Sequence, residues 1–313
     1  MVYVLSLIAA PSRAPLKASS VDRARQALDA AGANCGAADW LSPEEACDIP
    51  FEGAAETALA KVREALADAP VDINVVANDL RRKKLLVADM DSTLIEQECL
   101  DELAAEIGMR AEVSAITERA MRGEIPFEPA LRERVALLKG LSTDIVAKVL
   151  SSRIAIMGGA AILVATMRAS GAYTVLVSGG FTAFAEPIGR NIGFHEYRAN
   201  SLLSEADRFT GLLAEPILGR EAKEEALLEF AARLGLEPAQ TLAVGDGAND
   251  IGMIRRAGLG VAYRAKPALR AEADATIDHA DLAGLLFLQG FRREEFVLRT
   301  EPEPHLAAAS GRR

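Results

Sequence analysis

The amino-acid sequence predicts an α/β protein: a doubly wound parallel sheet with an inserted helical cap, plus a small N-terminal α+β domain. Three observations favour this fold. After residue 84, short apolar segments alternate with helical ones, which is typical of a parallel sheet covered by helices. A long helical stretch interrupts that alternation at about residues 98–153, and residues 1–80 carry strand and helix patterns of their own. We therefore expect domains at 1–80 and 81–293, with the cap at about 98–153 and a flexible tail at 294–313.

The composition limits the class of protein and its partners. The 313 residues are half apolar and 26% charged, which is ordinary for a globular chain, and their net charge is −10. An acidic chain without a long basic stripe disfavours nucleic acid and anionic membranes as partners, but allows a small anionic substrate held by a cation. Three cysteines without Cys-x-x-Cys spacing indicate a reducing compartment, without disulfides or structural zinc. Three scattered histidines disfavour a histidine-based metal site or catalytic triad.

The N-terminal domain is expected to contain at least two strands and two helices. They are a strand at Val2–Ala9, a helix at Ser20–Ala31, a helix at about Ala54–Leu66 and a strand at Val71–Val76. This order suits a ferredoxin-like βαββαβ unit, although Gly32–Gly53 lacks clear strand signal. The apolar run Val2–Ala10 is only nine residues long and no Lys or Arg precedes it. It therefore predicts a strand rather than a signal peptide or a membrane span, which needs about twenty residues, and the protein is expected to be cytoplasmic.

The second domain is organised around the segment Leu85–Ala88. This segment has the length and composition of a strand buried on both faces, and it leads into Asp89 and Asp91. Residues two apart project to the same side of an extended chain, so these carboxylates would repel each other unless a cation lies between them. A hard divalent cation such as Mg²⁺ matches oxygen ligands best. The alternative is an acidic turn with Ser92 or Thr93 as the N-cap of a helix.

Two later strands also end in polar residues. Tyr173–Val177 leads into Ser178-Gly179-Gly180, and Thr241–Val244 leads into Gly245–Asp250, while weaker strands are expected at Gly260–Tyr263 and Ala275–Ile277. In a doubly wound sheet these ends converge on one edge with Asp89 and Asp91. The Ser-Gly-Gly segment would suit a phosphate, and the acids of Gly245–Asp250 would complete a metal site. Taken alone, the Ser-Gly-Gly segment is better explained as a tight turn, and Gly245–Asp250 is explained equally well as an acidic surface turn. Lys223 alone is better explained as a solvated helix charge.

Four ordered motifs resemble those of the haloacid dehalogenase-like phosphatases. They are Asp89-Met90-Asp91-Ser92-Thr93, Ser178-Gly179-Gly180, Lys223 and Gly245-Asp246-Gly247-Ala248-Asn249-Asp250. The stretches Asp89–Glu98, Met121–Phe127, Leu131–Val135 and Val177–Phe181 are further similar to the phosphoserine phosphatases within that superfamily. The resemblance covers about residues 84–288 and does not firmly include residues 1–80, although some members carry a regulatory-type domain there.

The resemblance implies a role for each residue of the expected site. Asp89 would be the nucleophile that forms an aspartyl-phosphate, and Asp91 the general acid and base. Mg²⁺ would be held by Asp89, by Asp91 through its backbone carbonyl, and by Asp246. The remaining roles follow the same resemblance: Ser178, Gly179, Lys223 and Asn249 would bind phosphate, Asp250 would support the metal or Lys223, Glu98 would bind the substrate ammonium and Arg134 its carboxylate, and Met121 and Phe127 would lie near the substrate.

The resemblance therefore implies a Mg²⁺-dependent phosphatase that converts O-phospho-L-serine to L-serine and phosphate. Two alternatives stay open: a phosphatase of the same superfamily acting on another small phosphomonoester, and a catalytically dead serine- or metal-binding protein. The expected partner is the small molecule phosphoserine, without nucleic acid or membrane. A homodimer is compatible with the sequence, which leaves open both the oligomeric state and a regulatory ligand for residues 1–80.

Overall fold

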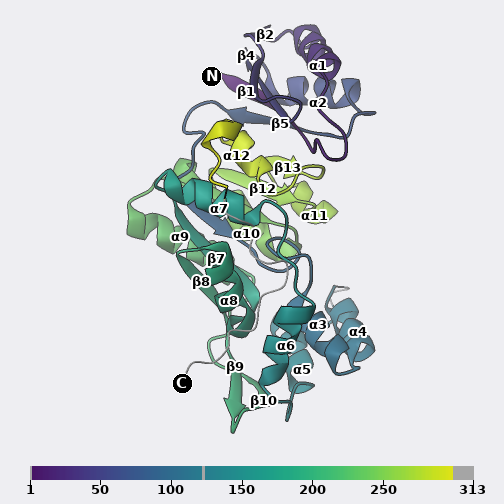
Figure 1. The fold of residues 1–313 in the computed structure, drawn as a ribbon, viewed down its shortest axis with the longest axis vertical. Helices are drawn as coiled ribbons and strands as arrows, with labels where there is room; N and C mark the ends of the chain where they lie inside the picture. Colours follow the sequence, from purple (N-terminus) through teal and green to yellow (C-terminus); the bar gives the residue numbers. More distant parts are fainter. Residues whose placement is uncertain (1, 122–123, 299–313) are drawn as a thin grey trace.

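A computed structural model describes residues 2–121 and 124–298, and these residues form three parts along the long axis of the molecule (Figure 1). The N-terminal part lies at one end, a parallel sheet with its helices lies in the middle, and the cap lies at the other end. No helix among the described residues is both long and apolar enough to cross a lipid bilayer.

The N-terminal part is an antiparallel sheet with two helices. Its elements are β1 (Tyr3–Ala9), α1 (Ala18–Ala30), β2 (Asn34–Cys35), β3 (Asp39–Ser42), β4 (Ala46–Glu52), α2 (Ala55–Ala65) and β5 (Val71–Ala77). The strands pair in the order β2-β4-β1-β5, and β3 also pairs with β4. Side chains of β1 alternate between two cores: Leu5 and Leu7 pack with α1 and α2, whereas Val4 and Ile8 join the core of the central part.

Strands β2, β3 and β4 lie in the segment Gly32–Gly53, where the sequence pattern showed no clear strand. The apolar pattern of β4 is interrupted by Asp48 and Pro50. The structure buries Asp48 and pairs its carboxylate with Arg81, which lies 33 residues further along the chain. Local sequence does not reveal a partner that distant, so β4 could not be predicted from its own residues.

The central part is the predicted doubly wound parallel sheet. Its strands are β6 (Leu85–Ala88), β7 (Tyr173–Phe181), β8 (Glu196–Asn200), β11 (Thr241–Gly245), β12 (Leu259–Tyr263) and β13 (Ala275–Ile277). They pair in the order β13-β12-β11-β6-β7-β8, and each pair is parallel. The motif strand β6 is thus in the middle of the sheet, and the strand order reverses beside it, which is where such folds place their ligands.

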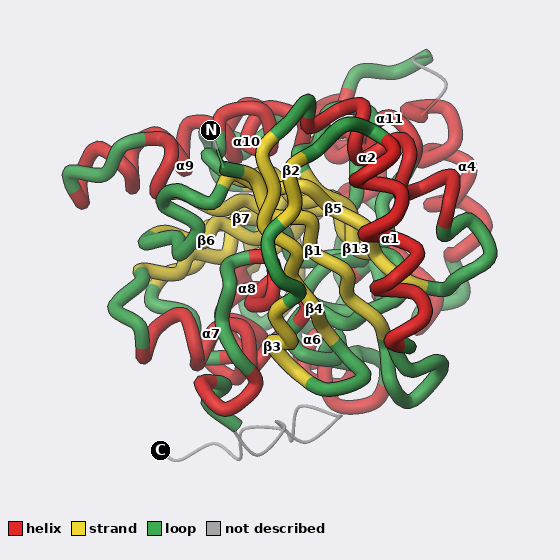
Figure 2. Tube along the Cα trace, turned by 90° about the horizontal axis from the view of Figure 1, so that it is seen from above, coloured by secondary structure: helices red, strands yellow, loops and turns green. Residues whose placement is uncertain are grey.

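Helices cover both faces of this sheet. They are α7 (Ala160–Ala169), α8 (Thr182–Ile192), α9 (Glu221–Leu234), α10 (Ile251–Arg256), α11 (Pro267–Arg270) and α12 (Gly284–Leu288). Leu86 and Ala88 of β6 face the core that contains α7, α8 and α12, whereas Leu85 and Val87 face the core of α9, α10 and α11. Figure 2 shows the strands running between these two groups of helices. A four-residue strand that is apolar at every position is explained by burial on both faces.

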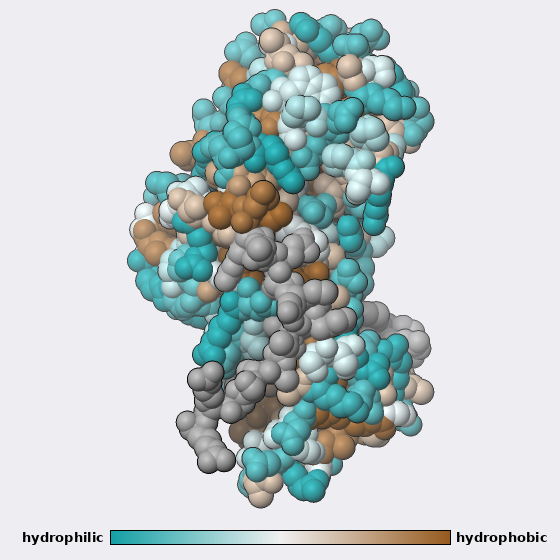
Figure 3. Space-filling model, in the orientation of Figure 1, coloured by the Kyte–Doolittle hydropathy of each residue, from teal (hydrophilic) through white to brown (hydrophobic). Residues whose placement is uncertain are grey.

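The cap follows β6 and contains the four helices α3 (Cys99–Glu106), α4 (Arg110–Met121), α5 (Phe127–Ala136) and α6 (Asp144–Ser152). Its two connections to the sheet run side by side, because Ile95 and Ile156 form an antiparallel bridge. A hairpin of β9 (Leu202–Glu205) and β10 (Arg208–Leu213), which the sequence did not predict, adds to the cap. Its Phe209 exchanges backbone hydrogen bonds with Gly140 and Leu141. The cap forms the lobe at the lower end of the molecule in Figures 1 and 3.

Edge strand β8 was also missed by the sequence analysis. The strand pairs on one side only and its first residues are half-exposed, so a mostly polar sequence, Glu-Tyr-Arg-Ala-Asn, is tolerated there. Such a sequence lacks the apolar pattern by which a strand is recognised. The predicted tail at 294–313 lies largely outside the described residues. Its first residues pack on the central part: Phe296 is buried against Phe287, and the Val297 amide donates to the Thr166 hydroxyl at 2.8 Å.

The N-terminal part docks on the central part through strands β5 and β13. The Asn74 side chain of β5 both donates to the Thr276 carbonyl and accepts from the Thr276 amide, at 2.9 and 2.8 Å. It thereby satisfies the edge of β13 as a neighbouring strand would. The Asp72 carboxylate accepts hydrogen bonds from the amides of Asp278, His279 and Ala280. The contact is therefore specific and polar as well as apolar.

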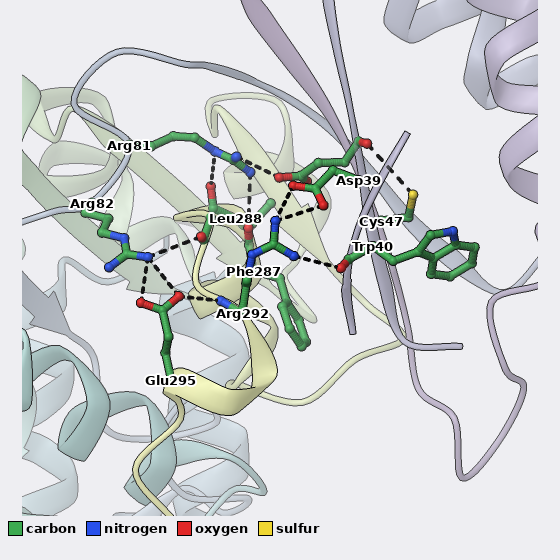
Figure 4. Close-up of polar contacts among 11 residues, drawn as sticks. Asp39, Trp40, Cys47, Arg81, Arg82, Phe287, Leu288, Arg292 and Glu295 are labelled. Atoms are coloured by element: carbon green, nitrogen blue, oxygen red, sulfur yellow. Dashed lines mark hydrogen bonds and ion pairs between the residues drawn. The ribbon is translucent and has the colours of Figure 1, made fainter. Parts of the chain in front are cut away.

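Arginine side chains form ion pairs and hydrogen bonds at a second part of this contact (Figure 4). Arg81 pairs with the Asp48 carboxylate at 2.7 Å and donates to the carbonyls of Phe287 and Leu288 at the end of α12. Arg292 Nη2 donates to both oxygens of the Asp39 carboxylate. Burial raises the pKa of Asp48 even with Arg81 beside it, so Arg81 is what allows Asp48 to stay charged there.

We expect Arg81→Ala to lower the free energy of unfolding by about 3–5 kcal/mol, because it leaves the buried Asp48 carboxylate without its partner. The matched control is Arg82→Ala, since Arg82 is half-exposed in its pair with Glu295 and should cost about 1 kcal/mol or less. Urea unfolding followed by the fluorescence of the single tryptophan, Trp40, measures both. Equal losses for the two variants would contradict this account of the interface.

Candidate active site

The register of the central sheet brings three segments of the chain together. Ala88 of β6 lies opposite Val244 of β11 and Leu176 of β7. The residues that follow, Asp89, Gly245-Asp246 and Val177-Ser178, therefore leave the sheet at the same edge. The Asp89 amide donates to the Val244 carbonyl at 3.0 Å, which continues the strand pairing to the first acid. This confirms the expected convergence of the strand ends.

Lys223 is the charge centre of this edge. Its ammonium lies 2.6 Å from Asp89 Oδ1 and 2.6 Å from Asp250 Oδ1, and its side chain is only 2% exposed. Burial lowers the pKa of Lys223, but the carboxylates of Asp250 and Asp89 outweigh that effect, and the net shift is upward. Lys223 is therefore a buried ammonium held between two acids, not a solvated helix charge.

Three buried carboxylates share the site. Oxygen atoms of Asp89, Asp246 and Asp250 all lie within 4.8 Å of one another. Burial, and then the charge of Asp250, raise the pKa of Asp89 well above its ordinary value and that of Asp246 to about 6. Lys223, and the exposed Lys266 at 4.0 Å from Asp246 Oδ2, supply two positive charges against three negative ones, so the group can accept a further cation. Its donors are all carboxylate oxygens, which suits a hard divalent ion such as Mg²⁺.

Backbone amides and Lys223 hold the carboxylates of Asp89 and Asp250 in place. Asp89 Oδ1 accepts from the Met90 amide at 2.7 Å as well as from Lys223. Asp250 Oδ2 accepts from the amides of Asp246 and Gly247, so the loop after β11 folds around this side chain. A Cβ at Gly245 would lie 2.4 Å from the Asp250 carboxyl, which explains why the loop has glycine at that position.

Asp91 and Ser178 meet at Gly180. A Cβ built on Gly180 would lie 3.1 Å from both Asp91 Oδ2 and Ser178 Oγ, so these two polar groups converge on one glycine. The Gly180 amide donates to Ser178 Oγ at 2.9 Å. Desolvation, and then the charge of Glu98, raise the pKa of Asp91 to about 7. At neutral pH this carboxyl is therefore divided between its protonated and ionised forms, as a proton donor and acceptor needs to be.

Two predicted cap residues lie close to this edge. Glu98 is exposed and accepts from the Ser92 hydroxyl at 2.7 Å, and its charge acts on both Asp91 and Asp246. Arg134 of α5 is half-buried, donating to the Ala130 carbonyl and the Thr117 hydroxyl. Burial lowers the pKa of Arg134, and the charges of Asp101 and Glu98 oppose that shift. The charge of Glu98 thus reaches Arg134.

Phe127, the first residue of α5, brings the cap down to the sheet. Its ring lies 3.4 Å from where a Cβ on Gly179 would be, and its side chain is 40% exposed. Gly179 is thus enclosed between the sheet edge and the cap. The side chain of Met121, which was expected nearby, lies outside the described part of the chain.

Asn249 is exposed, and its side-chain oxygen lies against Gly247. It is the expected phosphate ligand that is least enclosed by protein.

The structure adds two polar residues that the sequence analysis did not single out for chemistry. Asn200, at the end of β8, is buried and donates to the carbonyls of Gly179 and Leu218, while its oxygen accepts from the Leu218 amide. It ties the Ser-Gly-Gly segment to the loop before α9. Thr93 donates to Asp246 Oδ1 at 3.4 Å and is fully buried. A lone asparagine after an unpredicted strand carries no local signal, whereas Thr93 lay in the first motif.

Comparison with known proteins supports these motifs. A family described as haloacid dehalogenase-like hydrolase matches residues 86–255. "Phosphoserine phosphatase SerB2" of Mycobacterium tuberculosis is 42% identical over 245 residues, which is 78% of this chain and 59% of that protein. The chain thus spans well under two thirds of that relative's length. "Phosphoserine phosphatase" of Polaromonas sp. is 44% identical over 223 residues, which is 69% of this chain and 94% of that protein.

A solved structure extends the likeness to the N-terminal part. The unliganded form of a probable phosphoserine phosphatase from Vibrio cholerae has a TM-score of 0.77 at 29% sequence identity. The match covers 94% of this chain and 88% of that one.

Proposed function

The chain belongs to the haloacid dehalogenase-like hydrolases, and we propose that it hydrolyses O-phospho-L-serine to L-serine and inorganic phosphate. The observation that carries this proposal is the edge of the sheet where Asp89, Asp91, Ser178, Lys223 and Asp246 meet. It offers a held carboxylate, a second carboxyl with a pKa near neutrality, and groups that suit a phosphate and a cation. The relatives named phosphoserine phosphatases favour this substrate among the phosphomonoesters.

In the first half of the proposed reaction, Asp89 attacks the phosphorus of the substrate. The new bond joins a carboxylate oxygen to phosphorus, the bond from phosphorus to the seryl oxygen breaks, and that oxygen takes the proton of Asp91. Lys223 and the Met90 amide hold Asp89 Oδ1, so the carboxylate is oriented before the substrate arrives. The raised pKa of Asp91 allows it to carry the proton at neutral pH.

In the second half, water attacks the phosphorus of the aspartyl-phosphate. Asp91, now ionised, takes a proton from that water, and the bond to Asp89 breaks to release phosphate. Ser178, the Gly179 amide, Lys223 and Asn249 would hold the phosphoryl oxygens through both halves. Mg²⁺, held by Asp89, Asp246 and the Asp91 carbonyl, would supply positive charge against the phosphoryl group.

Glu98 and Arg134 are proposed to select phosphoserine. An ammonium and a carboxylate distinguish this substrate from other small phosphomonoesters. Glu98 can pair with the ammonium, and the planar fork of Arg134 can bind the carboxylate. The charge of Glu98 acts on both Arg134 and Asp91, which supports the assignment.

We also propose that the protein acts in the cytoplasm. Its cysteines Cys35, Cys47 and Cys99 are free thiols, which suits a reducing compartment.

The acidic charge of the whole chain does not prevent binding of phosphoserine, which is an anion. Lys223 and the proposed Mg²⁺ would supply positive charge where the substrate binds.

Asp89→Asn should lower phosphate release from phosphoserine by roughly 10³-fold or more, because an amide cannot form the covalent intermediate. The side chains are nearly isosteric, so the circular dichroism spectrum should not change. Asp22→Asn, on the exposed face of α1, is the matched control and should keep full turnover. Turnover by Asp89→Asn at the wild-type rate would exclude the covalent route.

Glu98→Gln should lower the preference for phosphoserine over an amine-free analogue by about tenfold, as expected for one lost charge-assisted hydrogen bond. Arg134→Ala should lower kcat/KM for both compounds by roughly 10- to 100-fold, because both carry the carboxylate. The neighbouring Arg132 pairs with Glu128 and Glu215 at the surface, so Arg132→Ala is the control and should change neither value. If Glu98→Gln and Arg134→Ala leave selectivity and kcat/KM untouched, the substrate assignment is wrong.

A further inference from the structure

A cleft of about 300 Å³ opens where the N-terminal part meets the central sheet. One wall is formed by Arg63 of α2 and the start of β5, and the other by Arg270 of α11 and the turn that carries Asp278 and His279. The cleft is distant from the candidate active site, because β13 is the end strand and β12 and β11 separate it from β6. No role proposed above uses any of these side chains.

The two walls are held rigidly against each other. The Asp72 carboxylate accepts from the amides of Asp278, His279 and Ala280, so it anchors the turn and its acceptors are largely used. Arg270 is held in its place by an ion pair with Asp278. The cleft is therefore formed before any ligand arrives, which lowers the entropic cost of binding.

Arg63 is the group that lacks a counterion. Its guanidinium donates to the Ile73 carbonyl at 3.3 Å, and in the described part of the chain no carboxylate lies within ion-pair distance of it. Burial and the like charge of Arg270 lower the pKa of Arg63, and the charge of Asp278 opposes that shift. Two guanidinium groups thus face one cleft from opposite walls. Of the two acids that line it, Asp278 pairs with Arg270, and the oxygens of Asp72 accept from backbone amides.

We infer that this cleft binds a small phosphate-bearing anion between Arg63 and Arg270, with His279 at its edge. A tetrahedral dianion has enough oxygen atoms to accept from two guanidinium forks at once, and arginine forks match phosphate geometry. The volume fits inorganic phosphate or a small phosphomonoester. Because Arg63 and Arg270 come from different parts of the fold, the bound anion would join the N-terminal part to the central sheet.

Nuclear magnetic resonance of ¹³C-labelled histidine rings tests this site in the full chain. The chain has three histidines, so the His279 signal can be assigned with His279→Gln. Titration with inorganic phosphate should shift the His279 signal to saturation. In Arg63→Gln the apparent Kd should rise roughly 10- to 100-fold, the loss expected for a charged hydrogen-bonding partner. Hydrolysis of phosphoserine by this variant should stay at the wild-type rate.

Arg25→Gln is the matched control, because Arg25 is exposed on α1 and does not line the cleft. It should titrate like the wild type. Arg63→Lys keeps a cation without the fork and should bind with intermediate affinity, which separates ligand binding from a folding defect. An identical titration in Arg63→Gln, or no saturable shift of His279 in the wild type, would overturn the inference.

A second titration distinguishes the two sources of the phosphate group. O-phospho-L-serine is added to Asp89→Asn, with and without Arg63→Gln in the same chain. An Arg63-dependent shift of His279 with both compounds supports recognition of the phosphate group wherever it is carried. A shift with inorganic phosphate alone supports a site for the free anion.

Discussion

The burial of three carboxylates around one ammonium is the constraint on which the rest of the structure depends. Asp89, Asp246 and Asp250 place three negative charges in one site. The buried Lys223 supplies one positive charge, and the exposed Lys266 lies 4.0 Å from Asp246. Such a group is costly to fold unless its remaining charge is neutralised. The pKa values of Asp89 and Asp246 are raised because burial and the charge of Asp250 disfavour their ionised forms. A divalent cation would remove that cost, and the same cation would then attract a phosphate.

The sheet supplies the geometry that this charge group needs. Strand β6 pairs in parallel with both β7 and β11, so the three strands run in the same direction. The residues that follow each of them therefore lie at the same edge of the sheet. Every side chain of Leu85–Ala88 is packed between two layers of helices, and this packing holds the strand in place. The strand can therefore be followed directly by the acid Asp89. The cap returns to this edge through Phe127, whereas the N-terminal part docks on the far strand β13. Catalytic groups and interdomain contacts thus lie at different strands of one sheet.

The sequence predicted what depends on neighbouring residues and missed what depends on distant ones. Asp89, Ser178 and Asp246 could be placed because each follows an apolar strand, and Lys223 only because the motif order identified it. The ferredoxin-like order expected strands between α1 and α2, but the residues of β4 could not be assigned because Asp48 is stabilised by the distant Arg81. Strand β8 was missed because an edge strand can be polar. Asn200 joins Gly179 to Leu218 through contacts that no local pattern encodes. The charge balance around Lys223 also required coordinates, since it depends on three separate segments.

Calorimetric titration of the metal-depleted chain with Mg²⁺ tests the central claim most directly. We expect one binding site, whose affinity falls at least tenfold in Asp246→Asn, because that change removes one of the three clustered carboxylates. Asp207→Asn, at the exposed turn of the β9–β10 hairpin, should bind like the wild type. Absence of Mg²⁺ binding, or binding that Asp246→Asn leaves unchanged, would contradict a cation site at this edge of the sheet.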